Sequence, residues 1–328
     1  MPENAPVISI LIVAFNSRPF IEHCLASVSH ACGDLPHEVL LIDNGLDGTE
    51  AFVRERFPKV RIIASRGNVG FGQANNILAA HADPDSRFLV LVNPDVRLES
   101  GAIAALVRAA DTHPDYVALG GQMQTPDGSP SAASIVRLPT VWRMTLGAIG
   151  IANWANARSL ADPAQQEVQR VEAISGGFLL LRPEDWKRLG GFDETYFLYG
   201  EDIDLCHRIG LLNGKIGLVP SARVHHDVGS GDFYSPARTR YKVTANAHFA
   251  NQHFGPVKRR AFKAALWIRC WIRWLLGLLL GRLPSQKALR LRALGNAFRL
   301  PAVNPASWVH GFDSEGSDPR RATSRGEF

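Results

Sequence analysis

The chain has 328 residues, of which 46% are hydrophobic and 20% are charged. This is an ordinary globular composition, and the length suits one large α/β domain with an appendage. The net charge of +5 is unevenly distributed, because residues 1–255 carry 22 Lys or Arg and 27 Asp or Glu, whereas residues 256–328 carry 14 and 4. The basic character therefore belongs to the C-terminal region, for which we expect an anionic surface as partner.

The cysteines and the N-terminal residues favour a reducing compartment and a first strand over a disulfide scaffold and a signal peptide. The four cysteines show no CxxC spacing, which fits a reducing cytoplasm. The first six residues lack a basic segment, so the apolar run that follows them is interpreted as a strand. We therefore expect a cytoplasmic protein.

Strand and helix patterns alternate over the first 110 residues. Val7–Val13 predicts a buried strand, and Asn16 or Ser17 is the expected N-cap of the following helix. Further strands are predicted at Glu38–Ile42, Val60–Ala64 and Phe88–Val92, with helical spacing after the glycine-rich segment 66–72 and after residue 102. This alternation predicts an α/β fold with a doubly wound, mostly parallel sheet and flanking helices.

The strand Phe88–Val92 is followed by Asn93-Pro94-Asp95. Five apolar residues are typical of a strand buried on both faces, and Pro94 ends it. Ligands of open α/β sheets bind at the carboxyl edge of the strands. A carboxylate beside an amide oxygen suits a hard divalent cation that also holds phosphates. The segment thus predicts a metal–diphosphate site.

The pattern becomes irregular after residue 120. Residues 121–170 contain turn dipeptides and weak periodicity, so we interpret them as a long, partly ordered connection over the site. A strand is expected at Ser175–Leu181, a helix at Glu201–Leu212 and a short β-like segment at Ala222–Val224.

Two acidic positions have both a structural and a chemical interpretation. Asp43 ends a strand, where its carboxylate can accept a hydrogen bond from the imide N–H of a pyrimidine base, although Asp43-Asn44-Gly45 is also strong turn chemistry. Glu201 and Asp202 open a helix, where they are either capping acids or a crowded pair. Crowding should raise at least one pKa of the pair, as a general base requires.

Two further segments could contact a ligand. The glycines between residues 67 and 72 precede a helix and could present backbone N–H groups to phosphate or sugar, but their spacing is neither GxGxxG nor a Walker motif. His225 and His226 follow the short β-like segment, and one of them could give a nitrogen ligand to a cation at Asp95. A histidine pair can equally be a surface or packing feature.

The motifs together resemble the family 2 inverting glycosyltransferases, especially the bacterial rhamnosyltransferase-like branch. The resemblance covers about residues 5–255 and rests on the order and spacing of seven segments. These are Val7–Asn16, Asp43-Asn-x-x-Asp-Gly-Thr49, Asn68-x-Gly-Phe-Gly-x-x-Asn-Asn76, Leu91-Val-Asn-Pro-Asp95, Ser175-Gly-Gly-Phe178, Gly190-Gly-Phe-Asp-Glu-x-Tyr-Phe197 and Glu201-Asp-Ile-Asp-Leu-Cys-His-Arg208.

The resemblance implies a GT-A fold, a nucleotide-sugar donor and Mg²⁺ or Mn²⁺ as cofactor. By position, Asp202 would be the general base beside Glu201. Asp95 would ligate the metal at the place of the family's DxD motif. His226 would complete the metal site, although His225 matches the motif nearly as well. The implied donor-binding residues are Asn16, Asp43, Asn68, Gly70, Asn75 and Asn93.

Two positions depart from the family pattern. The segment after Asp43 is one residue shorter than usual and lacks a serine, so its turn should differ. Asn93 replaces the first Asp of DxD, which weakens direct cation binding and makes Asn93 a helper rather than a ligand. Such an Asn is common in this branch.

The C-terminal region predicts a basic amphipathic helix. Arg259, Lys263, Arg269 and Arg273 fall within roughly 120° on a helical wheel, and three tryptophans lie among the leucines. The longest uncharged run, 274–281, is far shorter than the ~20 residues of a membrane span. A helix lying in the membrane interface fits this pattern, whereas packing on the catalytic domain or on a second subunit is the alternative.

The resemblance implies that residues 1–255 form a nucleotide-sugar glycosyltransferase domain. The charge pattern and composition predict 256–310 as the basic helical tail and 311–328 as a disordered C-terminus. The expected activity is inverting transfer from a dTDP-rhamnose-like or UDP-sugar donor to a hydroxyl of a glycan, lipid-linked if the tail binds the inner face of the cytoplasmic membrane. The alternative is a non-catalytic nucleotide-sugar or glycan-binding module. Nucleic acid is not expected as a partner, because the tail's aromatic residues lie among leucines.

Overall fold

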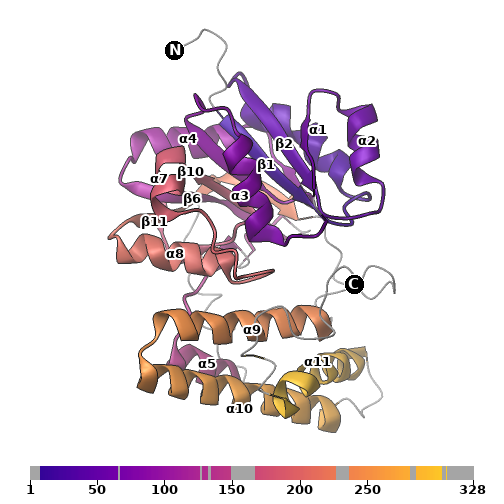
Figure 1. Cartoon of the computed structure of the whole chain (residues 1–328), viewed down its shortest axis with the longest axis vertical. Coiled ribbons are helices and arrows are strands. Elements are labelled where there is room, and N and C mark those ends of the chain that lie inside the picture. Colours follow the sequence, from indigo (N-terminus) through magenta and orange to yellow (C-terminus); the bar gives the residue numbers. More distant parts are fainter. Residues whose placement is uncertain are drawn as a thin grey trace. The chain divides into compact units, whose positions relative to one another are not determined.

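The computed structural model describes residues 8–65, 67–125, 128–131, 134–148, 167–226, 236–280, 286–304 and 308. The chain forms two compact units (Figure 1). The sheet unit comprises residues 1–138, 160–194 and 201–228, and the helical unit comprises residues 139–159, 195–200 and 229–328.

The sheet unit is built around a nine-stranded sheet of the described residues, with the order β3-β2-β1-β4-β10-β6-β11-β5 and with β8 paired to β11. Strands β3, β2, β1 and β4 are parallel to one another, whereas β10 is antiparallel to both β4 and β6. The strands of this sheet are β1 Ile8–Ala14, β2 His37–Asp43, β3 Arg61–Ile63, β4 Phe88–Val92, β5 Val96–Leu98, β6 Tyr116–Gln124, β8 Gln169–Arg170, β10 Phe178–Leu181 and β11 Lys215–His226; β7 Ile135–Val136 and β9 Ala173–Ile174 form a separate pair.

Helices cover both faces of this sheet because successive strand residues point to opposite sides. Ile8, Ile10 and Ile12 of β1 are fully buried in one apolar core together with α1 and α4, whereas Leu11 and Val13 belong to a second core with α3, α7 and α8. The helices of this unit are α1 Ile21–Cys32, α2 Thr49–Arg56, α3 Phe71–His81, α4 Ala102–Thr112, α7 Pro183–Leu189 and α8 Glu201–Leu211. The predicted doubly wound, mostly parallel sheet with flanking helices is confirmed.

The helical unit contains α5 Val141–Ala148, α9 Pro236–His253, α10 Pro256–Leu280 and α11 Gln286–Val303. Helices α10 and α11 approach closely at Gly295, where an added Cβ atom would lie 2.5 Å from the Cα atom of Gly277. The indole of Trp267 donates a hydrogen bond of 3.0 Å to the carbonyl of Ala302 across the same helix pair. In the part of the chain that the structure describes, no helix is long and apolar enough to cross a membrane.

Several local predictions need correction. Helix α1 begins at Ile21 after Phe20 and has no side-chain cap. Ser17 instead accepts a hydrogen bond from the backbone N–H of Phe15, and Asn16 adopts a positive φ of 50°. Within 121–170, β6 continues to Gln124 and α5 occupies 141–148, so this stretch is more regular than predicted, while residues 149–166 lie outside the described part.

The C-terminal basic stripe also differs from the prediction. The guanidinium of Arg273 donates to the carbonyl of Gly147 at 3.0 Å, and that of Arg269 donates to the sulfur of Met144 at 3.4 Å. Both arginines are thus directed toward α5, whereas Ile268, Leu275 and Leu279 of α10 are 48%, 46% and 67% exposed. Between residues 268 and 279 the exposed face of α10 is apolar, so Arg269 and Arg273 do not continue a solvent-facing basic stripe from Arg259 and Lys263.

The compact units also divide the chain differently from the predicted domains. The helical unit takes up α9, which precedes the predicted boundary at residue 255, and it includes residues 139–159 and 195–200. Apart from Trp308, residues 305–328 lie outside the described part, and so does the predicted disordered C-terminus at 311–328.

Candidate active site

The carboxyl ends of β1, β2 and β4 meet at one edge of the sheet. In the parallel register Ala14 of β1 lies opposite Asp43 of β2, and β4 pairs with β1 on its other side. This arrangement brings the segments that contain Asn16, Asp43 and Asn93 to the same edge, where open α/β sheets bind ligands. The predicted donor-binding segments are therefore neighbours in space.

The carboxylate of Asp43 is held by backbone groups. Its two oxygens accept hydrogen bonds from the N–H groups of Gly45 and Glu50, each at 2.9 Å. Its side chain is buried, and burial raises its pKa although these two hydrogen bonds oppose the rise. These two hydrogen bonds are the ones expected if Asp43 stabilises a turn. A hydrogen bond to a nucleobase would have to use a remaining lone pair of the Asp43 carboxylate.

The glycine-rich segment is tied to the end of β2 by Asn44, which the sequence analysis had not singled out. Its side-chain N–H donates to the carbonyl of Gly70 at 3.2 Å. Asn68 closes the turn by accepting from the N–H of Gly70 at 3.1 Å. The buried amide of Asn75 donates to the carbonyl of Phe71 within α3. Asn16, by contrast, is exposed at the same edge.

The turn 175–177 connects the Asn93 segment with the acidic helix α8. The N–H of Asn93 donates to the carbonyl of Gly177 at 2.9 Å, and the N–H of Gly176 donates to Oδ2 of Asp202 at 3.2 Å. An added Cβ atom on Gly177 would lie 3.0 Å from the side-chain nitrogen of Asn93, and one on Gly176 would lie 3.6 Å from Cβ of Asp202. The absence of a side chain at Gly177 therefore leaves room for the amide of Asn93, whereas the distance from Gly176 to Asp202 is an ordinary van der Waals contact.

Burial governs the electrostatics of the two acids at the start of α8. Glu201 is 5% exposed, and burial, followed by the charge of Asp202, raises the pKa of Glu201 to about 8. Burial also raises the pKa of Asp202, although the backbone N–H groups of Gly176 and Ile203 stabilise its charged form. The direction agrees with the prediction, but desolvation contributes more than crowding.

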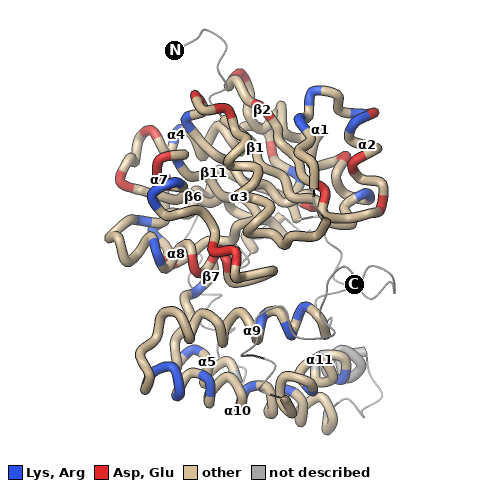
Figure 2. The backbone as a smooth tube through the Cα atoms, in the orientation of Figure 1, with Lys and Arg blue, Asp and Glu red and all other residues tan. Residues whose placement is uncertain are grey.

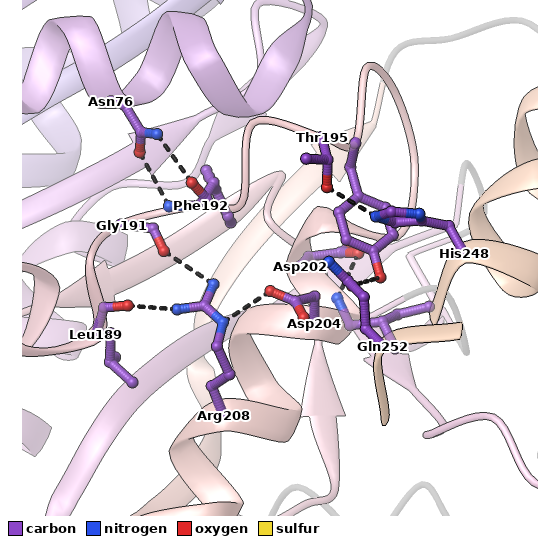
Figure 3. Close-up of polar contacts among 12 residues, drawn as sticks. Asn76, Leu189, Gly191, Phe192, Thr195, Asp202, Asp204, Arg208, His248 and Gln252 are labelled. Atoms are coloured by element: carbon purple, nitrogen blue, oxygen red, sulfur yellow. Dashed lines mark hydrogen bonds and ion pairs between the residues drawn. The ribbon is translucent and has the colours of Figure 1, made fainter. Parts of the chain in front are cut away.

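Helix α8 is fixed to the preceding loop by a network of hydrogen bonds (Figure 3). Arg208 binds Asp204 at 2.7 Å and donates to the carbonyls of Leu189 and Gly191 at 2.5 and 2.9 Å. The amide of Asn76 on α3 both donates to and accepts from the backbone of Phe192, each at 2.9 Å. Asn76 and Arg208 were not predicted as site residues, but they orient the helix that carries Asp202.

Asp95 lies beside His226. Oδ2 of Asp95 is 3.5 Å from Nε2 of His226, because antiparallel pairing of β5 with β11 places His226 opposite Val96. The preceding residue, His225, instead contacts Glu99 at 2.9 Å. An oxygen and a nitrogen donor at the sheet edge fit a divalent cation that takes its other ligands from phosphate and water. Among the described residues, no group of three or more metal-ligating side chains occurs.

Comparison with known proteins identifies the family. A model of the family described as glycosyl transferase family 2 matches residues 9–152, and one described as the N-terminal domain of galactosyltransferase matches residues 162–228. An N-acetylglucosaminyl-diphospho-decaprenol L-rhamnosyltransferase from Mycobacterium tuberculosis is 32% identical over 286 residues, which cover 82% of this chain and 89% of that protein. The chain belongs to glycosyltransferase family 2.

Two further proteins are similar to this chain, one in sequence and one in fold. Rhamnosyltransferase WbbL from Escherichia coli is 24% identical over 70% of this glycosyltransferase and 88% of its own length. The structure of a mannosyltransferase from Pyrobaculum calidifontis, in complex with GDP-Man and Mn²⁺, matches with a TM-score of 0.53 and 19% identity over 94% of this chain and 86% of that one. The GT-A fold and the likeness to rhamnosyltransferases are thereby confirmed.

Proposed function

We propose that this family 2 glycosyltransferase transfers a sugar, with inversion, from a dTDP-rhamnose-like or UDP-sugar donor to a hydroxyl of a lipid-linked glycan during cell-surface polysaccharide synthesis. The proposal is carried by one observation: Asp202, on α8, and Asn93, after β4, both bind the turn 175–177 at the ligand-binding edge of the sheet. The name of the mycobacterial relative supports the sugar and the diphospho-lipid acceptor.

Asp202 is the proposed general base. Inverting transfer is an in-line displacement at the anomeric carbon, so the acceptor hydroxyl must lose its proton as the new C–O bond forms and the bond to the leaving diphosphate breaks. Because burial raises the pKa of Asp202, its carboxylate is a stronger base than an exposed aspartate. Glu201, with a pKa of about 8, keeps its proton at neutral pH, so the neighbouring Asp202 is not opposed by a second negative charge.

Asp95 and His226 are the residues proposed to hold Mg²⁺ or Mn²⁺. When bound, the cation would neutralise charge on the leaving diphosphate. Asn93, Asp43, Asn16, Asn68, Gly70 and Asn75 stay proposed donor-binding residues. The polar groups of Asp43 and Asn75 are engaged mainly with backbone atoms, so we expect these two to shape the donor pocket more than to contact the donor.

The acceptor proposal extends to the location of the enzyme. We propose peripheral binding at the inner face of the cytoplasmic membrane through the exposed apolar residues of α10 rather than through its basic residues. Replacing Leu275 and Leu279 together by Glu should abolish co-flotation with phosphatidylglycerol vesicles. Leu46→Glu, at a leucine that is 89% exposed in the sheet unit, is the control. If the double variant still floats with the vesicles, the apolar face of α10 does not bind the membrane. If the parent chain forms dimers and the double variant forms monomers, this face binds a second copy of the chain instead.

The activity test uses the full chain, nucleotide sugars, Mn²⁺ and a short-chain prenyl-diphospho-N-acetylglucosamine acceptor, with product measured by mass spectrometry. Asp202→Asn should lower kcat by about 10²–10⁴-fold while the donor still binds. Asp34→Asn, at an exposed carboxylate, should leave kcat unchanged. Full activity of Asp202→Asn would overturn the mechanism, whereas donor binding without any product under all conditions would favour the non-catalytic binding module.

A further inference from the structure

The helical unit is charged almost entirely with one sign. Its described residues, which are 139–148, 195–200, 236–280, 286–304 and 308, include many Lys and Arg and no Asp or Glu. Figure 2 shows basic residues and no acidic ones along α9, α10 and α11. The described residues of the helical unit therefore carry a marked excess of positive charge.

Four of these basic residues form a cluster between two helices. Arg238 and Lys242 are four residues apart on α9, and Arg269 and Arg273 are four residues apart on α10, so each pair shares one helix face. The charges of Arg238 and Arg269 both act on Lys242, and the charge of Arg273 acts on Arg269. We call these four residues the basic cluster.

The contacts of the two arginines on α10, Arg269 and Arg273, leave some of their strong donors with weak acceptors or none. The guanidinium of Arg269 donates to a thioether sulfur, that of Met144, which is a weak acceptor. Arg273 donates to one carbonyl, that of Gly147. The Nε atoms of both arginines are buried and have no hydrogen-bond partner in the structure. The ammonium of Lys242 lies 4.8 Å from the ring centre of Tyr199.

This arrangement is unfavourable for a protein that binds nothing there. Burial lowers the pKa of Lys242 and of Arg269, and neighbouring positive charges lower both further. Buried charges are ordinarily paired, and like charges four residues apart on a helix repel each other. The side chain of Lys242 nevertheless keeps part of its surface exposed, so a ligand from solution can reach the cluster at this residue. A multivalent anion would supply acceptors for the two arginines and relieve the repulsion among the four positive charges.

We propose that the basic cluster binds the diphosphate group of the lipid-linked acceptor. Arginine presents a planar fork of donors that matches phosphate oxygens, and lysine adds a mobile point charge. The apolar face of the same helix α10 suits the lipid that carries such a diphosphate. The donor's diphosphate is assigned to the Asp95 edge of the sheet unit, so the two anionic groups have separate sites. This inference rests on the proposed function, of which it specifies the acceptor class.

Binding of farnesyl diphosphate to the full chain, followed by tryptophan fluorescence, tests the cluster without requiring sugar transfer. Lys242→Gln and Arg269→Gln should each weaken binding of farnesyl diphosphate at least tenfold, and binding of farnesol, which lacks the diphosphate, should not change. Arg260→Gln removes an exposed charge from α10 and is the matched control. If Arg269→Gln does not fold, Lys242→Gln alone decides. Equal binding by wild type and Lys242→Gln would overturn the proposal.

Two further measurements separate the possible sources of phosphate and the two proposals. With the prenyl-diphospho-sugar acceptor, the cluster variants should raise the acceptor KM about tenfold and leave the donor KM unchanged. If they instead reduce only co-flotation with phosphatidylglycerol vesicles, the cluster binds phospholipid head groups and the acceptor assignment is wrong. If farnesyl diphosphate binding depends on Lys242 but no sugar is transferred, the proposed function fails while the diphosphate site stands.

Discussion

Replacing Glu201 by Gln should make the protein less sensitive to alkaline pH. The pKa of the Glu201 carboxyl is raised from 4.5 to about 8 by burial and by Asp202. Between these two values the folded state keeps the proton while the unfolded state has lost it, so the free energy of unfolding falls as pH rises. Below pH 4.5 both states are protonated, and above pH 8 the loss is complete.

The expected magnitude follows from the width of the pH interval. Each pH unit within the window removes about 1.4 kcal/mol, so the change from pH 6.0 to 7.5 should remove about 2 kcal/mol through this residue. Glutamine cannot lose a proton, so Glu201→Gln should gain about 2 kcal/mol relative to wild type over the same interval.

Urea denaturation of both proteins at pH 6.0 and 7.5 measures this difference, and the histidines cancel because they are common to both. Glu55→Gln, at an exposed glutamate on α2, is the control and should follow wild type. Parallel pH dependence of wild type and Glu201→Gln would refute the reasoning that a protonated, buried Glu201 lies beside Asp202.

Other expectations concern the metal and the support of α8. If Asp95 and His226 hold the cation, His226→Gln should raise the Mn²⁺ concentration for half-maximal activity on the order of tenfold or more. The ring of His225 contacts Glu99 instead, so His225→Gln should change this concentration little. Equal effects of the two substitutions would refute the assignment. Asn76→Ala removes two hydrogen bonds to the Phe192 backbone and should lower the free energy of unfolding by about 2 kcal/mol in urea denaturation; an unchanged value would show that the loop does not depend on them.

The predicted elements of the first half of the sheet were found close to their expected bounds. Strand β4 is Phe88–Val92 as predicted, and helix α3 follows the glycine-rich segment. These elements could be predicted because each depends on local properties. A run of apolar residues buries itself on both faces, and a proline ends the ladder wherever it occurs. The predicted helix N-cap at Ser17 is wrong, because the Ser17 hydroxyl accepts a hydrogen bond from the backbone N–H of Phe15 in the preceding turn.

Non-local pairing decided what the pattern left open at the site. Strand β10 lies antiparallel between β4 and β6, and this insertion brings Gly176 and Gly177 between Asn93 and Asp202. The choice between His225 and His226 depends on β11, whose register to β6 shifts twice, at Lys215/Ile216 and at Val219/Arg223. The second shift leaves three extra residues on β11, an odd number that exchanges its two faces relative to β6, so alternation counted along the strand cannot assign His225 and His226.

The sequence by itself thus determined the family, the alternation of strands and helices, and the concentration of positive charge in the C-terminal region, because composition and local pattern carry that information. Only the tertiary structure decided where those charges point. A helical wheel shows that Arg269 and Arg273 share a face with each other, but whether that face meets solvent or protein depends on what packs against it. In this chain α5, which lies more than a hundred residues earlier, packs there and leaves the leucines of α10 exposed.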